Sequence, residues 1–434
     1  MPTNALGCGP IPGLPMLHSV RAISIAVVAL LVCALRVGAT DLQVFALASG
    51  LGSYSDSPVS WLDGGFGKLL AGSTSNGSAG LAGSIDLQTG VRFNLSEHWS
   101  AWGHVVARGE SDAAAGAAIG IAELWIEGTG EVAGGRLRAR AGTMFLPTSR
   151  ENVEPLWSSP YTISLSAINS WIGEEVRPTG IDVDYRYELS ARLLIRGGAT
   201  AFVGNDTAGT LLGWRGWSVG TRLSLWNEEL PLPPLASLET SFPAQKDGTT
   251  PIGSDLDGRT GWSARLRLDA SRGFVAQWTR FDNRGDRNLY RNEYSWCTNF
   301  DLIGMSWRPT DSLDLAAEHV RGKTGMGFAP GDSVDARFES TYVLASWKTG
   351  PIRLSTRFDW FDTEELDFSN AENNDESGSA IAVAFLLDVT SNWSLAVEFD
   401  DVNATRSSAL EALGTNILDG RALITRVRYR GLFD

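Results

Sequence analysis

Arginine recurs at every second residue in two segments of the chain, 136–140 and 426–430. On an extended strand, alternate residues share one face and lie roughly 6–7 Å apart. Guanidinium groups at that spacing would concentrate anions near the surface that carries them. The arginines of interest, including two on a third alternating segment, are Arg136, Arg138, Arg140, Arg353, Arg357, Arg426, Arg428 and Arg430.

Carboxylates on the same faces offer a second interpretation of these arginines. They are Asp86, Asp182, Asp184, Asp269, Asp359, Glu398 and Asp400. We expect many individual arginines to be paired with them inside a wall, so that only the collective charge acts on solutes.

Catalytic chemistry finds little support in the sequence. His319 follows Glu318, but neighbouring strand residues point to opposite faces and would not converge. His104 is expected to be a polar wall residue. We expect neither a Gly-x-Ser-x-Gly nucleophile elbow nor a zinc-binding His-Glu-x-x-His helix to accompany these histidines. We expect no catalytic residue, no cofactor and no metal site, and we interpret the seven carboxylates of segment 362–376 as a solvated loop.

The net charge and the cysteine content argue against several other classes of protein. The 434 residues carry 50 acidic and 36 basic side chains, a net charge of −14. Such a chain would repel a nucleic-acid backbone, so no nucleic-acid partner is expected. The three cysteines, two of them in the first 40 residues, are too few for a disulfide framework or a Cys-based zinc site.

The N-terminal region has the pattern of a secretory signal. Arg21 precedes an apolar stretch from Ala22 to Leu35. The residues Val37, Gly38 and Ala39 then offer small side chains for cleavage before Thr40. The stretch is too short to span a membrane as a helix, which needs about 20 apolar residues. We therefore predict that residues 1–39 are a signal peptide and are removed.

The rest of the chain alternates apolar and polar residues with period two, the pattern of strands with unlike faces. Segments 352–360 and 393–400 are examples. Short turns and long polar loops separate such segments in regular alternation, which is typical of an outer-membrane barrel. Nine long loops, with 205–213 and 244–258 among them, and eight turns, with 227–234 among them, predict an all-β transmembrane antiparallel barrel of about 18 strands. The alternative is 16 strands, because Leu235 to Phe242 is a weak strand.

The barrel is expected over residues 60–434, while the structure of 40–59 is left open. Tryptophans near predicted strand ends would form interfacial girdles. Those expected at the periplasmic turns are Trp99, Trp226, Trp307 and Trp393, and those expected at the external side are Trp214, Trp217 and Trp360.

The C-terminal strand ALITRVRYRGLFD has Leu423, Val427, Tyr429 and Phe433 on one face. It resembles the last strand of Gram-negative outer-membrane porins, by which such proteins are recognised for assembly. Segment 142–180 resembles a block found in uncharacterised porin-like proteins. The resemblance implies that its loop, 146–178, folds into the lumen and narrows it. The candidates to line that constriction, opposite arginines of the wall, are Arg150, Glu151, Glu154, Glu174, Glu175 and Arg177.

These observations predict a porin in the outer membrane of a Gram-negative bacterium, through which small hydrophilic solutes diffuse passively, with anions as candidates. The expected partners are outer-membrane lipid and lipopolysaccharide, the solutes and the barrel-assembly machinery, and a homotrimer is an open alternative to a monomer. The second function considered is a surface-exposed outer-membrane β-barrel hydrolase, which would depend on His104 and His319.

Overall fold

The computed structural model describes residues 41–73, 79–110, 118–226, 228–245, 248–328, 333–367 and 372–433. The predicted signal peptide lies outside these ranges and stays a prediction. Among the described residues, no helix is long and apolar enough to cross a membrane.

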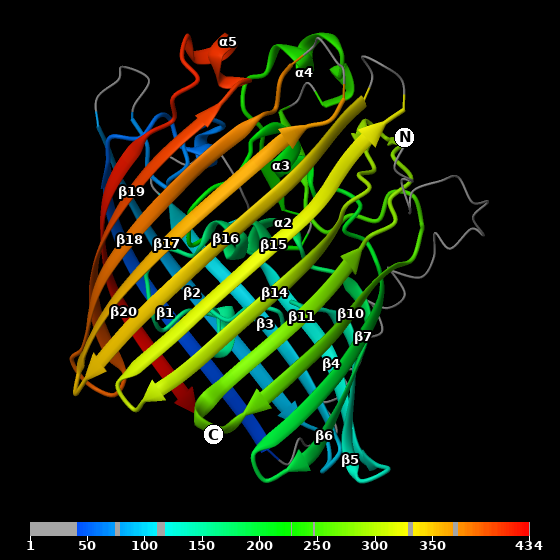
Figure 1. Ribbon diagram of the computed structural model, residues 1–434, viewed down its shortest axis with the longest axis vertical. Coiled ribbons are helices and arrows are strands. Elements are labelled where there is room, and N and C mark those ends of the chain that lie inside the picture. The colour runs from blue at the N-terminus through cyan, green and yellow to red at the C-terminus, as the bar shows by residue number, and fades with distance from the viewer. Residues whose placement is uncertain are drawn as a thin grey trace.

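Sixteen antiparallel strands form one closed barrel (Figure 1). Each strand pairs with the next in the chain, and β1 pairs with β20 to close the ring, for example at Ala48 and Tyr429. The strands are β1 (Asp41–Ser55), β2 (Gly80–Asn94), β3 (Trp99–Glu110), β4 (Ile119–Val132), β5 (Gly135–Thr143), β6 (Thr179–Ser190), β7 (Leu193–Val203), β10 (Gly261–Ala270), β11 (Phe274–Asp282), β14 (Asn299–Thr310), β15 (Leu313–Gly327), β16 (Ser333–Thr349), β17 (Ile352–Glu365), β18 (Glu376–Asp388), β19 (Trp393–Arg406) and β20 (Gly420–Phe433).

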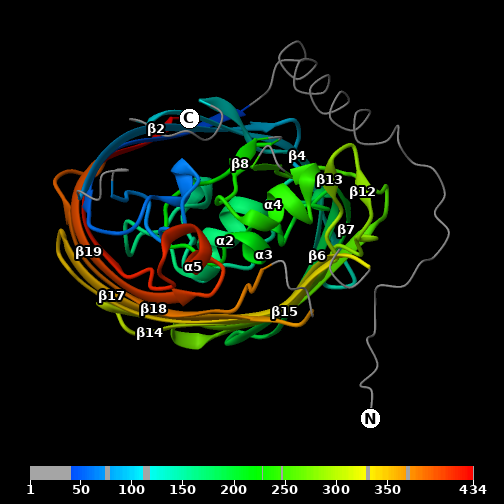
Figure 2. The same cartoon turned by 90° about the horizontal axis from the view of Figure 1, so that it is seen from above.

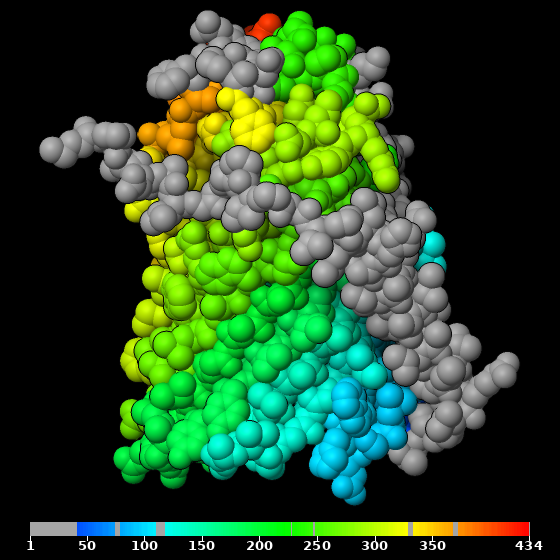
Figure 3. Space-filling view, turned by 90° about the vertical axis from the view of Figure 1, so that its right-hand side faces the viewer, coloured from blue at the N-terminus to red at the C-terminus, as the bar shows by residue number. Residues whose placement is uncertain are grey.

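The period-two pattern separates an apolar outer face from an inner face. On β19, Leu395, Val397 and Phe399 are 43–46% exposed, whereas Glu398 and Asp400 between them are at most 1% exposed. Closure matters for such a protein because lipid cannot satisfy the backbone groups of a sheet edge. Green and cyan residues form one continuous surface over the lower part of the molecule in Figure 3. The predicted fold class is confirmed.

Short elements occupy the connections between the strands. The helices are η1 (Trp61–Asp63), η2 (Pro155–Trp157), α2 (Ala167–Glu175), α3 (Thr210–Trp214), α4 (Ala236–Thr240), η3 (Pro243–Gln245), η4 (Ser271–Gly273) and α5 (Ala409–Leu413), and the paired short strands are β8 (Glu229–Pro231) with β9 (Thr249–Pro251) and β12 (Leu289–Tyr290) with β13 (Glu293–Tyr294). The long connections gather at one end of the barrel, here called the loop end, and the tight turns at the other, the turn end (Figure 1).

The barrel has the alternative count of 16 strands, so the count of 18 is wrong. Strand β7 pairs directly with β10, where Phe202 faces Gly261. Residues 204–260 between them therefore form one connection, and 227–234 is not a turn between barrel strands. Apolar and polar residues do alternate in segment 217–225. However, both faces of this segment are buried, as Leu223 and Ser224 show. Such a segment has no face left for lipid.

The start of the barrel and the places of three tryptophans also differ from expectation. Residues 41–55 form β1, so the barrel begins before residue 60. Trp214 and Trp217 are fully buried inside the barrel and do not belong to an external girdle. Trp226 is likewise part of the 204–260 connection rather than of a turn. The remaining predicted girdle residues are 38–53% exposed, and these are Trp99, Trp307, Trp360 and Trp393.

The largest hydrophobic cluster lies inside the barrel rather than between layers. Trp171 of α2 and Trp217 pack against Phe338 of β16, with ring centroids 5.1 and 6.1 Å from it. Seen from above, α2 and α3 lie within the ring of strands (Figure 2). Chain segments therefore fill much of the lumen, and not only the loop 146–178 that was expected to narrow it, because these inward aromatic groups pack against apolar partners.

Candidate functional site

The arginine row on β5 is largely paired within the wall. Arg140 bonds Asp182 of β6 at 2.9 Å, and Arg138 lies 3.9 Å from both Glu127 and Asp184. Arg136, at the turn end of the same strand, is exposed. The pairing hypothesis therefore holds for the inner two arginines of this row.

The arginines of β20 are also bonded to neighbouring groups or buried. Arg430 makes two bonds to the Glu154 carboxylate, at 2.7 and 2.8 Å. Arg428 donates to the hydroxyl of Ser49 at 3.3 Å. Arg426 is only 3% exposed. On β17, Arg353 lies 3.2 Å from Asp314 of β15.

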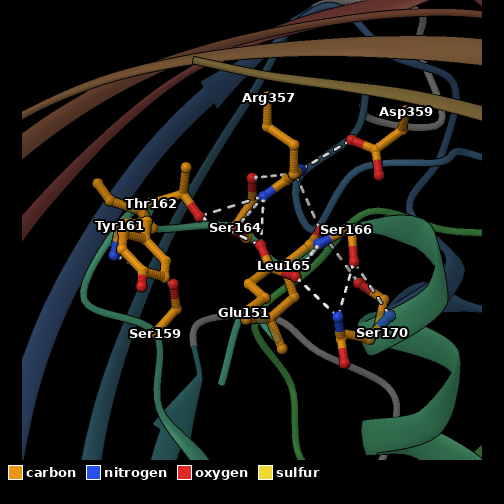
Figure 4. Close-up of polar contacts among 12 residues, drawn as sticks. Glu151, Ser159, Tyr161, Thr162, Ser164, Leu165, Ser166, Ser170, Arg357 and Asp359 are labelled. Carbon is orange, nitrogen blue, oxygen red and sulfur yellow. Dashed lines mark hydrogen bonds and ion pairs between the residues drawn. The ribbon is translucent and has the colours of Figure 1, made fainter. Parts of the chain in front are cut away.

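Arg357 of β17 holds the connection 144–178 inside the lumen (Figure 4). Its guanidinium bonds Glu151 at 2.9 Å and Asp359 at 2.7 Å, and all three side chains are fully buried. It also donates to the carbonyls of Ser164 at 2.6 Å and Leu165 at 3.0 Å. One wall arginine thus satisfies both the charge and the backbone of the inserted loop.

Helix α2 follows directly from this anchor. Ser166 is its N-cap, and the hydroxyl accepts from the backbone N–H of Asn169 at 3.2 Å. Glu151 accepts from the backbone N–H of Ser166 at 2.9 Å, and Asp359 accepts from that of Ala167 at 3.1 Å. Two carboxylates therefore lie at the positive end of the helix dipole.

The charged residues at the end of α2 join it to the second inserted segment. Glu174 bonds Arg215 at 2.6 Å. Glu175 accepts from the backbone N–H groups of Gly209 and Leu211, both at 2.9 Å. Burial raises the pKa of Glu175 from 4.5 to about 7, although these N–H groups oppose the shift. Arg177 lies 4.3 Å above the Phe145 ring, and burial lowers its pKa to about 10.

Sequence reasoning missed this second segment, residues 204–260. Its α3 is held by Glu175, and Arg406 of β19 donates to the carbonyl of Gly213 at 2.7 Å. The glycine content could have revealed that this segment is not a barrel strand, since residues 204, 209, 213, 216 and 220 are all glycine. Five glycines in 17 residues disfavour a strand. At Gly213, an added Cβ would lie 2.5 Å from the Trp296 ring, so close packing requires glycine there.

Two cavities of several hundred Å³ lie beside the inserted segments. The turn-end cavity measures about 770 Å³ and is lined by residues such as Phe45, Arg92 and Arg150. The loop-end cavity measures about 520 Å³ and is lined by residues such as Leu51, Gln88 and Arg108.

An apolar cluster lies between the two cavities along β1, β2 and β3. On β1, Leu47 stands between Phe45 of one cavity and Leu51 of the other. Leu47 packs with Trp102 and Leu156 in this cluster, which also contains Trp125 and Met144. We call this cluster the apolar constriction.

Two backbone features bring its members together. A Cβ at Gly90 of β2 would lie 2.4 Å from Trp102 and 2.6 Å from Leu156, so glycine lets both side chains reach the wall. Leu156 itself has a φ of 61°, a left-handed conformation that is strained for a leucine. Strain of this kind persists only where the surroundings enforce it.

The turn-end cavity carries more positive than negative side chains. Its lining holds five arginines (Arg92, Arg140, Arg150, Arg267 and Arg308) and three carboxylates (Glu123, Glu154 and Asp314). Arg92 lies 5.8 Å from the Trp125 ring and forms no ion pair with a carboxylate in the described part of the chain. The loop-end cavity is balanced, with Asp63 and Asp86 against Arg108 and Arg222.

The histidines lie apart from one another. His104 is fully buried and hydrogen-bonded to Gln88 at 3.1 Å. The side chain of His319 is 40% exposed, whereas Glu318 is buried in the lumen beside Asn169, at 2.7 Å. His319 and Glu318 therefore do not converge, as the sequence predicted.

Known structures share this fold. The outer membrane channel DcaP of Acinetobacter baumannii superposes with a TM-score of 0.50 at 10% sequence identity, over 90% of this chain and 97% of that one. The anion-selective porin from Comamonas acidovorans gives a TM-score of 0.50 at 10% identity, over 90% of this chain and 99% of that one. No protein-family model matches the sequence, and no curated protein matches it. The likeness is thus one of barrel architecture.

Proposed function

We propose that this protein is an outer-membrane porin through which small hydrophilic solutes diffuse passively. The observation that carries the proposal is the division of the barrel into an apolar, exposed outer face and an inner face that encloses a cavity with charged side chains toward each end. Outer-membrane residence follows from the same division, because the exposed apolar belt needs lipid. The loop end would face the outside and the turn end the periplasm.

The proposed path runs along β1, β2 and β3, from the loop-end cavity past the apolar constriction to the turn-end cavity. Leu47, Trp102 and Leu156 would set its narrowest point. Apolar constrictions of this kind limit ion flow by excluding water. The connection 144–178 supplies Leu156, so its role as a constriction loop is part of the proposal.

Anions are the proposed preferred solutes. The excess of arginine in the turn-end cavity would raise the local anion concentration. The Comamonas neighbour is described as anion-selective. On the β20 row, Arg430 is paired with Glu154, Arg428 is bonded to Ser49 and Arg426 is only 3% exposed. The preference would therefore depend on Arg92 more than on that row.

Single-channel recording in planar bilayers tests the proposal. Purified wild-type protein should give small, discrete conductance steps. Leu156→Gly should give larger steps, about twofold or more, because it removes an apolar side chain from the constriction and relieves the left-handed strain. Leu410→Ala, on the exposed helix α5, is the matched control and should leave the steps unchanged.

Folded protein without discrete steps would refute the porin proposal. If Leu156→Gly and the wild type had equal conductance, the porin function would stand, but the proposed path past Leu156 would be refuted.

The partners proposed with this function are lipid, lipopolysaccharide, the solutes and the assembly machinery. β20 would present the assembly signal, since Phe433 at its end is 52% exposed. A homotrimer is proposed as the assembly, and the mass of the protein in detergent measures it.

A further inference from the structure

The two ends of the inserted segment 204–260 meet at the loop end of the barrel. Asp206 follows β7, and Asp255 and Asp257 precede β10, the strand with which β7 pairs. The backbone N–H of Asp206 donates to the carbonyl of Ser254 at 3.1 Å. One Asp206 oxygen, Oδ2, accepts from the N–H groups of Leu256 at 2.6 Å and Asp257 at 3.2 Å. The outgoing and returning arms are therefore already in contact.

The three carboxylates at this junction lie close enough to share one ion. One oxygen from each of Asp206, Asp255 and Asp257 lies within 4.8 Å of the other two. Oxygen ligands of calcium lie about 2.3–2.6 Å from the ion, so two on opposite sides are up to about 5 Å apart. The spacing fits a single calcium ion. Asp255 and Asp257 are partly exposed, which leaves room for water ligands and for entry of the ion.

A buried atom without a partner points to a missing ligand. Asp206 is fully buried, and its second oxygen, Oδ1, has no hydrogen-bond partner among the described residues. A buried acceptor left unsatisfied costs about 1–3 kcal/mol. A cation would satisfy this oxygen.

The charges around the junction are likewise unbalanced. Within the described ranges, none of the three carboxylates forms an ion pair with a basic side chain. Three carboxylates in a small space favour a hard divalent cation with oxygen preference.

We propose that Asp206, Asp255 and Asp257 bind one calcium ion, which ties together the two arms of the inserted segment at the loop end. The sequence gives no sign of this site, because the three residues are separated by up to 51 positions and only the fold brings them together. The ion would hold the inserted segment in the lumen. The proposal does not depend on conduction by the barrel.

Calcium binding to the purified full-length protein tests the site. After EDTA treatment and its removal, titration with CaCl₂ by calorimetry should show a saturable site in the wild type. Asp206→Asn and Asp255→Asn should each weaken that site at least tenfold. Glu239→Gln, an exposed carboxylate change on α4 in the same inserted segment, is the matched control and should bind as the wild type does.

Protease sensitivity provides a second readout. Calcium should slow chymotrypsin cleavage within 204–260 in the wild type and in Glu239→Gln, but not in Asp206→Asn or Asp255→Asn. Should Asp206→Asn fail to fold, Asp255→Asn alone decides, because Asp255 is partly exposed and its substitution buries no new group. The absence of a saturable site in the wild type, or equal affinity in folded Asp255→Asn, would overturn the proposal.

Discussion

At the scale of single residues, the selectivity for charged solutes depends on the side chains whose charge is not paired with an opposite charge. Arg140 and Arg430 bond carboxylates, and Arg357 holds the inserted loop. Their fields are therefore largely cancelled at the distance of a passing solute. Arg92 differs, because it lines the turn-end cavity beside the Trp125 indole and forms no ion pair among the residues that the structure describes. A row of arginines in the sequence thus says less about selectivity than one unpaired arginine in the structure.

Arg92→Gln should reduce the anion preference. Removal of this positive charge lowers the local anion concentration in the turn-end cavity, so the reversal potential under a salt gradient should shift toward that of cations. Arg192→Gln, on the exposed turn between β6 and β7, should leave it unchanged. An unchanged reversal potential in Arg92→Gln would remove this residue from the selectivity mechanism.

At the scale of elements, the two inserted segments stabilise each other. Glu175 at the end of α2 accepts from the first backbone N–H groups of α3 and from the Trp171 indole at 2.6 Å. The carboxylate lies opposite a helix N-terminus, where negative charge is favoured. Burial outweighs that effect and raises its pKa to about 7. The contact between α2 and α3 should therefore depend on pH.

The stability of the wild type should fall as pH rises through the range from about 4.5 to about 7, relative to Glu175→Gln. The folded protein keeps this proton to a higher pH than the unfolded chain, so the stabilisation is complete below pH 4.5 and lost by about pH 7. The shift corresponds to about 3 kcal/mol in the free energy of unfolding. Urea unfolding followed by tryptophan fluorescence at several pH values measures it.

Glu175→Gln cannot titrate at this position and serves as the reference. Glu411→Gln, on α5 and exposed, should follow the pH dependence of the wild type. Parallel curves for Glu175→Gln and wild type would contradict the assigned pKa.

At the scale of the whole molecule, the wall and its contents are separable. The 16 strands close the barrel by pairing with one another, and residues 204–260 contribute no strand to it, since β7 pairs directly with β10. The inserted segments instead fill the interior, where Trp214 and Trp217 are fully buried. Barrel closure and lumen width are therefore set by different parts of the chain.

Replacement of 205–259 by a short Gly/Ser linker should leave a folded barrel with larger conductance. The pairing between Phe202 and Gly261 can be retained, while the aromatic groups of the segment leave the lumen. Heat-modifiable migration in gels reports the folded barrel, and bilayer recording reports the conductance. Removal of 409–414, which contains α5 outside the lumen, should not change conductance. A variant that fails to fold would show that the segment is needed for the wall itself.

The sequence alone determined the barrel, its two unlike faces and the alternation of short turns with long loops. These features are local, because successive side chains of each strand point to opposite faces. It also predicted that Glu318 and His319 face apart and that arginines such as Arg140 pair within the wall. Glu151 and Arg357 were both named as candidates, but not as each other's partner.

Only the tertiary structure decided what lies inside the barrel. Alternation at 217–225 looks the same whether lipid or protein covers the apolar face, so sequence could not separate a sixteen-strand barrel with an inserted segment from eighteen strands. The apolar constriction and the junction of Asp206 with Asp255 and Asp257 join residues far apart in the chain. Contacts of that range depend on how the barrel closes, and no local pattern encodes them.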